Sequence, residues 1–133
     1  MFLVKTGLSA VPLEHPLFIF TALLSTLAGA ALILSAGYYF KKAKTTVNPI
    51  YPDAATQLVI QGIYRYSRNP MYLGFVLLLC AWGLFLGDLI TFIVIPAFIL
   101  IITYFQIIPE ERALTDKFGE AYKQYLVTVR RWI

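Results

Sequence analysis

A chain of 133 residues is expected to form one domain. Hydrophobic residues make up 59% of it and the mean hydropathy is +0.73, so we expect an integral membrane protein and not a soluble domain. The net charge of +4 requires no nucleic-acid partner, because positive residues also mark the cytoplasmic side of membrane proteins. One cysteine, Cys80, and one histidine, His15, exclude an internal disulfide and argue against a metal site or a Ser-His-Asp triad.

Three apolar segments predict an all-α fold with about three transmembrane helices. Residues 1–15 form a mildly apolar N-terminal segment, either a surface helix or a frayed end. The first span covers residues 16–40, which carry no charge and include small residues that permit close helix contact. Residues 41–69 follow as a cytosolic loop with turn signals at 45–49 and 51–53. Five cations and one acid lie in this loop: Lys41, Lys42, Lys44, Arg65, Arg68 and Asp53.

The second span covers residues 71–87, which as a helix would be about 25 Å long. Gly87 and Asp88 predict a tight turn, so the second span forms a hairpin with the third, residues 89–108. Pro96 lies inside the third span and predicts a kink there.

The remaining residues, 110–133, form a polar tail. Its apolar residues recur at steps of three and four, which predicts a C-terminal amphipathic cytosolic helix over residues 110–128 (Leu114, Phe118, Tyr122, Tyr125 and Leu126). Gly119 weakens or interrupts this pattern. The loop and the tail are rich in cations, whereas the turn between the second and third spans has none, so both are expected in the cytoplasm with the N-terminus outside.

Two groups of polar residues are expected to meet at the cytoplasmic ends of the second and third spans. In the first group, Asn69 is a good N-cap and Pro70 suits the first helical position, where the free N–H groups favour an anion. The second group is Glu110 and Glu111, which need solvent or cations at a membrane boundary. An ion-pair network without any ligand is therefore an open alternative, with four arginines as partners (Arg65, Arg68, Arg112 and Arg131).

Three separate motifs resemble the isoprenylcysteine carboxyl methyltransferase and phospholipid methyltransferase superfamily. They are residues 62–74 (Gly-Ile-Tyr-Arg-Tyr-Ser-Arg-Asn-Pro-Met-Tyr-Leu-Gly), 110–114 (Glu-Glu-Arg-Ala-Leu) and 118–125 (Phe-Gly-Glu-Ala-Tyr-Lys-Gln-Tyr). Residues 45–49 and 129–132 look like the short bacterial branch of the superfamily. The resemblance runs from about residue 20 to the end of the chain, and the order of the motifs makes it specific.

The resemblance implies a membrane methyltransferase that uses S-adenosylmethionine, located in a bacterial inner membrane with its active site on the cytoplasmic face. The implied methyl acceptor is a lipophilic small molecule or lipid with a carboxyl, thiol or amine group. The cofactor-binding candidates are Tyr64, Arg68, Asn69, Pro70, Tyr72, Leu73, Gly74, Glu110 and Glu111. The catalytic candidates are Arg131, carried over as the arginine near the reacting group, and Arg68.

The chemistry of these residues suits the implied cofactor. A carboxylate such as Glu110 or Glu111 can pair with an ammonium group or ribose hydroxyls, and Arg68 can hold the cofactor carboxylate. Tyrosine rings such as Tyr64 and Tyr72 offer faces to adenine or to a cation. Methyl transfer needs in-line positioning and exclusion of water more than covalent help from the protein.

Some features depart from the superfamily pattern. Many relatives have histidine where Asn69 stands, and an amide cannot accept a proton as a general base. With only three spans per chain, we expect a second copy to close the pocket, which predicts a homo-oligomer. An NADPH-dependent steroid-reductase-like enzyme is an alternative, although Met71 and Phe75 differ from the reductase motif. A non-enzymatic lipid-binding or assembly protein is another.

Overall fold

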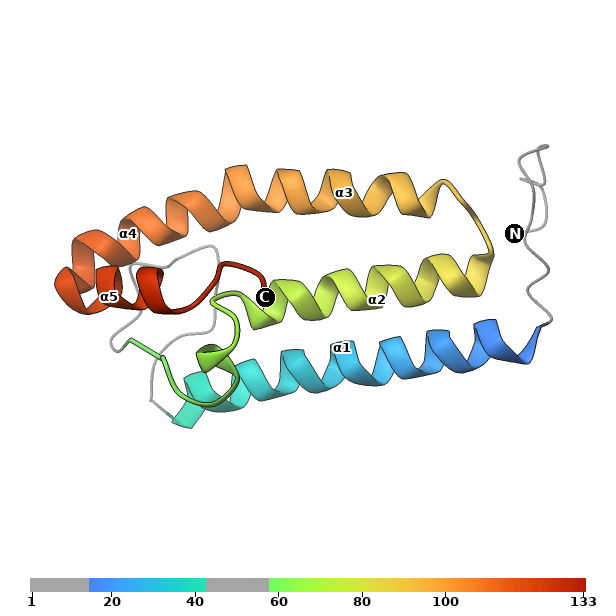
Figure 1. The fold of residues 1–133 in the computed structure, drawn as a ribbon, viewed down its shortest axis with the longest axis horizontal. Helices are drawn as coiled ribbons and strands as arrows, with labels where there is room; N and C mark the ends of the chain where they lie inside the picture. The colour runs from blue at the N-terminus through green and yellow to red at the C-terminus, as the bar shows by residue number, and fades with distance from the viewer. Residues whose placement is uncertain (1–14, 43–57) are drawn as a thin grey trace.

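The computed structural model describes residues 15–42 and 58–133. Most of the N-terminal segment and the turns expected at 45–49 and 51–53 lie outside these residues. Within them, all secondary structure is helical, as the sequence predicts (Figure 1). The elements are α1 (Pro16–Lys42), the short 3₁₀ helix η2 (Gly62–Arg65), α2 (Pro70–Leu86), α3 (Thr91–Ile102), the π-helical η3 (Thr103–Ile107), α4 (Ile108–Phe118) and α5 (Glu120–Thr128).

Three antiparallel rods make up the body of the molecule, with α2 between α1 and α3 (Figure 1). Two of the rods, Pro16–Lys42 and Thr91–Phe118, are long and apolar enough to cross a membrane by length and composition. The middle rod, Pro70–Leu86, is also apolar but only 17 residues long. At 1.5 Å per residue it measures about 25 Å, slightly less than the hydrocarbon core of a bilayer.

Small residues allow α1 and α2 to approach closely. A Cβ atom added to Gly74 would lie 2.8 Å from the carbonyl oxygen of Gly29 and 2.7 Å from Cγ1 of Ile33, so only glycine fits this crossing. Nearby, the Ser25 hydroxyl donates a hydrogen bond across the interface to the Leu77 carbonyl oxygen, 2.7 Å away. Backbone contact and interhelical hydrogen bonds are how helices associate in lipid, where apolar surface gives no driving force.

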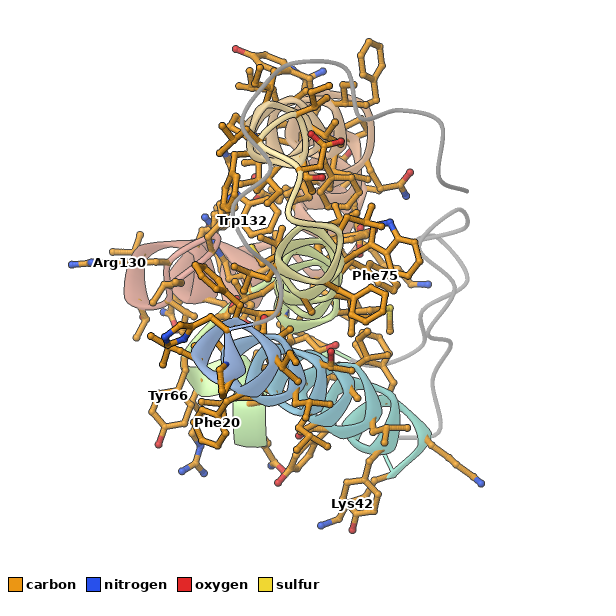
Figure 2. All side chains as sticks on the ribbon, turned by 90° about the vertical axis from the view of Figure 1, so that its right-hand side faces the viewer. Phe20, Lys42, Tyr66, Phe75, Arg130 and Trp132 are labelled. Carbon is orange, nitrogen blue, oxygen red and sulfur yellow. The ribbon has the colours of Figure 1, made fainter. Side chains whose placement is uncertain are left out.

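Large apolar side chains cover the outside of the rods. No residue of α3 is buried, and Figure 2 shows Phe20 of α1 and Phe75 of α2 pointing away from the body of the molecule. A soluble protein rarely exposes so much contiguous apolar surface. Such a surface is suited to lipid contact.

The turn between α2 and α3 forms where the sequence predicts it. Gly87 has φ 61° and ψ 30°, a left-handed conformation that glycine adopts without steric cost, and its N–H donates to the Gly83 carbonyl oxygen at 2.9 Å. The Asp88 carboxylate then accepts a hydrogen bond from the Ile90 N–H at 2.9 Å. Together these contacts reverse the chain within a few residues.

In place of one continuous helix over residues 110–128, the structure contains two helices that meet at Gly119, where the sequence indicates a weakening or a break. The first, α4, continues the third rod after a π-helical turn that ends just before Pro109, which has no N–H to donate. The chain then breaks at Gly119, whose φ of 60° and ψ of −129° suit only glycine. The second helix, α5, folds back against the ends of the rods (Figure 1).

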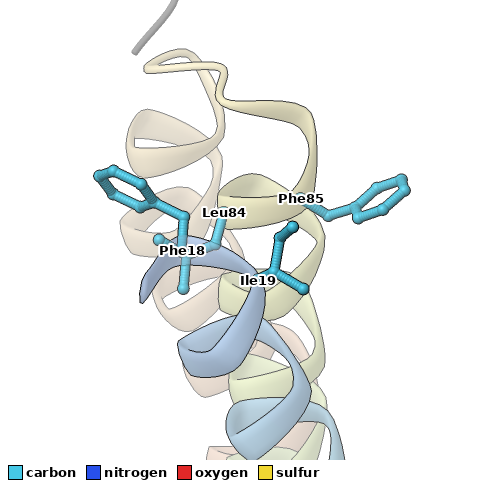
Figure 3. Close-up of a pocket in the computed structure, with 4 residues that line it drawn as sticks. All are labelled: Phe18, Ile19, Leu84 and Phe85. Carbon is cyan, nitrogen blue, oxygen red and sulfur yellow. The ribbon is translucent and has the colours of Figure 1, made fainter. Parts of the chain in front are cut away.

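A compact core lies at the end of the molecule where α5 packs. Its buried residues are Ala36, Val59, Tyr64, Tyr122, Tyr125 and Val129, with the apolar stripe of α4 and α5 packed around them. An apolar cavity of about 250 Å³ lies at the other end, between the start of α1 and the end of α2 (Figure 3). Its lining residues, Phe18, Ile19, Leu84 and Phe85, offer no charged group to a ligand.

Candidate functional site

The loop that leads into α2 is fixed by tyrosine contacts. Tyr64 is buried in the core, with its ring 5.3 Å from that of Phe40. The Tyr125 hydroxyl of α5 donates to the Tyr64 carbonyl oxygen at 2.7 Å, and burial raises the pKa of Tyr125, so this phenol remains a donor. These contacts therefore fix the conformation of the loop before α2.

Asn69 precedes the first residue of α2, as predicted, but its side chain makes no capping hydrogen bond. Its Nδ2 atom instead donates to the Arg131 carbonyl oxygen at 2.9 Å. Local sequence favours the N-cap interaction, whereas the folded chain brings a carbonyl of the C-terminal tail within reach of the same amide. The capping role expected for Asn69 is therefore wrong, and the residue ties the tail to α2.

Glu111 holds two arginines from distant parts of the chain. Its Oε1 atom lies 3.0 Å from Nη1 of Arg68, and Arg131 donates from Nε and Nη2 to its two oxygens at 3.0 and 2.9 Å. The Arg68 and Glu111 side chains are only 10% and 14% exposed, whereas the Arg131 side chain is 36% exposed. The hydrogen bonds with Glu111 raise the pKa of Arg131, which stays charged.

Glu110 points to a different neighbour. Its Oε2 atom accepts a hydrogen bond of 3.2 Å from the Tyr72 hydroxyl in the first turns of α2. Glu110 lies beyond the apolar stretch of the third rod, yet burial raises its pKa to about 7. The charge of Glu111 adds to this rise and the hydrogen bond from Tyr72 opposes it. A cation placed beside Glu110 would favour the ionised form.

The two acids serve different partners because consecutive helical residues point about 100° apart around the axis. The π-helical turn at Thr103–Ile107 also precedes them and shifts their direction relative to an uninterrupted α-helix. The signal in the sequence that could have suggested this turn is Pro109, two residues after its end.

The structure brings five of the predicted site residues together where the three rods end: Arg68, Tyr72, Glu110, Glu111 and Arg131. We call this group the acid–arginine cluster. The antiparallel hairpin explains the meeting of the two motifs, as the sequence predicts. Polar contacts and burial also fit an ion-pair network, so the geometry alone does not specify a ligand.

The other predicted site residues have structural surroundings. Pro70 is fully buried, Gly74 faces α1, and Tyr64 lies in the core. The Leu73 N–H donates to the Asn69 carbonyl oxygen within the first turn of α2. These four residues therefore stabilise the structure around the cluster.

One buried donor of the cluster is unused. Nε of Arg68 is buried and has no hydrogen-bond partner among the residues that the structure describes. An unpaired buried donor is costly, so an acceptor atom of a bound ligand would be stabilised there. The cluster therefore has one unpaired donor, whose charge suits an anion, and one carboxyl group at Glu110, which suits a cation.

The C-terminal tail contributes contacts that sequence analysis missed. The Arg68 N–H donates to the Arg130 carbonyl oxygen at 3.0 Å, next to the contact between Asn69 and Arg131. Arg131 was expected among the partners of the paired acids, but main-chain acceptors leave no signature in a sequence, so the two hydrogen bonds to the tail carbonyl groups were not predicted. The tail thereby becomes one wall of the acid–arginine cluster.

Comparison with known proteins identifies the family. The family model described as phospholipid methyltransferase matches residues 17–121. A protein of Haemophilus influenzae named as uncharacterized is 46% identical over 63 residues, which is 47% of this chain and the whole of that relative. No solved structure matches the chain. The match covers the first two of the three sequence motifs in full, confirms the resemblance, and indicates a methyltransferase. The chain belongs to the phospholipid methyltransferase family.

Proposed function

We propose that the chain is an S-adenosylmethionine-dependent methyltransferase that acts on a lipophilic acceptor at the cytoplasmic face of a bacterial inner membrane. The observation that carries this proposal is the acid–arginine cluster, where two acids of α4 meet Tyr72 and two arginines at the ends of the rods. Membership of a methyltransferase family supplies the reaction class.

The cluster offers both charges that this cofactor needs. Glu110, held by Tyr72, would pair with the ammonium or sulfonium cation, since Glu111 already holds two arginines. The unused Nε of Arg68 would donate to the cofactor carboxylate. When bound, S-adenosylmethionine supplies an activated methyl group. These residues therefore bind and orient the donor.

Arg131 would lie on the acceptor side of the site. Its side chain is the most exposed of the three that form the ion pairs, and its hydrogen bonds with Glu111 fix its direction. A guanidinium held in this way can position a carboxyl, thiol or amine acceptor without covalent chemistry. Lipid at the sides of the rods would deliver such an acceptor and exclude water.

The membrane orientation follows from charge. Lys41 and Lys42 lie in the last turn of α1, at the same end as the cluster, whereas the turn at the opposite end carries Asp88 and no cation. Positive residues concentrate on the cytoplasmic side. We therefore place the cluster in the cytoplasm and treat α2 as a third, short span.

A binding experiment with purified protein in detergent tests the proposal. Calorimetry should detect binding of S-adenosylmethionine and none of NADPH. The variants Glu110→Gln and Arg68→Ala should each weaken binding about tenfold or more, because each removes a charged partner. Glu120→Gln, at the exposed ion pair of α5, is the matched control and should bind as the parent does.

Two results would overturn the proposal. Unchanged affinity in both cluster variants would discard the site, and absence of S-adenosylmethionine binding in the parent would discard the cofactor. Binding of NADPH would favour the reductase alternative. The methyl acceptor can then be sought by incubating the protein with labelled S-adenosylmethionine and membrane lipid extracts.

A second copy of the chain would complete the proposed site. None of the residues of α3 is buried, so a second copy could pack against this rod. We therefore propose a homo-oligomer. Light scattering should give a mass above that of one chain, and an active monomer would contradict this.

A further inference from the structure

Asn69 connects the start of α2 to the end of the chain. The residue is buried, its N–H donates to Oγ of Ser67 at 3.1 Å, and its Nδ2 donates to the Arg131 carbonyl oxygen at 2.9 Å. One residue earlier, the Arg68 N–H donates to the Arg130 carbonyl oxygen at 3.0 Å. Two consecutive carbonyl groups of the tail are therefore held by two consecutive residues that precede α2.

These contacts decide which arginine faces Glu111. The tail leaves α5 at Val129 in extended conformation, with φ −120° and ψ 132°. Side chains of extended backbone point alternately to opposite sides. Accordingly, Arg131 bonds to both oxygens of Glu111, whereas Arg130 is exposed and projects away from the molecule (Figure 2). A shift of one residue along the tail would exchange the two arginines.

We propose that Asn69 is a positioning residue that acts through Arg131. Its amide fixes the register of the tail, so that the guanidinium of Arg131 is presented to Glu111 in bidentate geometry. This inference rests on the proposed function for its effect on cofactor binding, but the effect on the tail stands independently of it. The role differs from direct cofactor contact, which the motif suggested for Asn69.

The tail can be observed directly through Trp132. The chain has two tryptophans, so the substitution Trp82→Phe leaves Trp132, next to Arg131, as the single fluorescent reporter. In this background, Asn69→Ala should shift the emission of Trp132 to longer wavelength, because the half-buried ring becomes solvated when the tail is released. Asn69→His, whose ring N–H can donate to the same carbonyl, should restore the parent spectrum.

A double-mutant cycle tests whether Asn69 acts through Arg131. Arg131 shares Glu111 with Arg68, so its loss should disturb the position of Arg68, which we propose binds the cofactor. Asn69→Ala and Arg131→Ala should therefore each weaken S-adenosylmethionine binding about tenfold, and the double variant should be no weaker than Arg131→Ala alone to within about twofold. Arg130→Ala is the matched control: its side chain is exposed and its carbonyl contact remains, so affinity and emission should not change. Thermal unfolding of each variant shows that it is folded.

The outcomes separate the two proposals. Parent-like emission of Trp132 in a folded Asn69→Ala variant would overturn the positioning role. Fully additive losses in the cycle would also overturn it, because Asn69 would then act on the cofactor independently of Arg131. Absence of S-adenosylmethionine binding in the parent would instead refute the proposed function, while the emission shift would still report on the tail.

Discussion

The three rods α1, α2 and α3, which we call the shaft, differ from the acid–arginine cluster at their end in which side chains are buried. In the shaft, the buried residues of α1 are the small Ala22 and Gly29, and the large apolar side chains lie outside. At the cluster end, tyrosines and polar groups such as Ser67 and Asn69 are buried and hydrogen-bonded. The shaft and the cluster end thus differ in the kind of residue that is buried.

This difference reflects two solvents. Lipid solvates the large apolar side chains of the shaft, so helices gain stability there from close backbone contact. In the orientation that we propose, water surrounds the cluster end, where a hydrophobic core and paired charges are needed. Substitutions should therefore have large effects at the cluster and smaller ones in the shaft, as the following experiments test in descending order.

The largest loss of stability is expected from Glu111→Gln. This substitution leaves Arg68 and Arg131 adjacent without their shared anion, and breaking a buried pair in this way costs about 3 kcal/mol, toward the lower end of the usual range because Arg131 is partly exposed. Chemical denaturation in detergent measures the change. The matched variant Glu120→Gln should lose less than about 0.5 kcal/mol, and equal losses in both would refute a special role of Glu111.

Glu110 should make stability depend on pH. Its folded pKa of about 7 exceeds that of an ordinary glutamate, so between about pH 4.5 and pH 7 the folded chain binds more protons than the unfolded chain. The free energy of unfolding therefore falls as pH rises, by about 2 kcal/mol between pH 5.5 and pH 8. Denaturation curves for the parent and for Glu110→Gln should differ in this slope. Identical slopes would show that Glu110 is not buried as described.

In the shaft, Gly74→Ala should cost about 1 kcal/mol. The new methyl group would clash with the carbonyl oxygen of Gly29, and this overpacking outweighs the better helix propensity of alanine. Gly37→Ala, where nothing lies within 4 Å of the added atom, should be neutral or slightly stabilising. Thermal unfolding separates the two. Lost S-adenosylmethionine affinity with unchanged stability would instead assign Gly74 to the cofactor.

The smallest effect is expected from Ser25→Ala. It removes the hydrogen bond to the Leu77 carbonyl oxygen, and such bonds between membrane helices average about 0.6 kcal/mol. Thr26→Ala removes a hydroxyl that bonds only to Ala22 of its own helix, and it should have no measurable effect on the contact between α1 and α2. A loss of stability above about 2 kcal/mol for Ser25→Ala would mean that hydrogen bonds stabilise the shaft more than we infer.

Hydropathy and turn preferences were sufficient to predict the rods and the meeting of the two motifs at their end. Uncharged runs predicted the helices, and Gly87 and Asp88 predicted the reversal that brings Glu110 close to Tyr72. These features depend on residues close together in the sequence, which is where periodicity and turn preferences act.

The long-range partners of Asn69 and Gly74 escaped prediction. The amide of Asn69 has a local role available as an N-cap, and only the folded tail offers the Arg131 carbonyl that it bonds instead. Gly74 belongs to a functional motif, yet its contact is Gly29 of another helix. The break at Gly119 was foreseeable, whereas the direction of α5 after it depends on packing against the core.

Ultraviolet crosslinking of methyl-labelled S-adenosylmethionine, followed by mapping of the labelled peptides, tests the central claim most directly. If the acid–arginine cluster binds the methyl donor, label should appear in peptides that contain residues 62–72 or 106–118, and excess unlabelled cofactor should remove it. Label confined to the cavity of Phe18 and Phe85 at the opposite end, or label that no competitor displaces, would contradict the account.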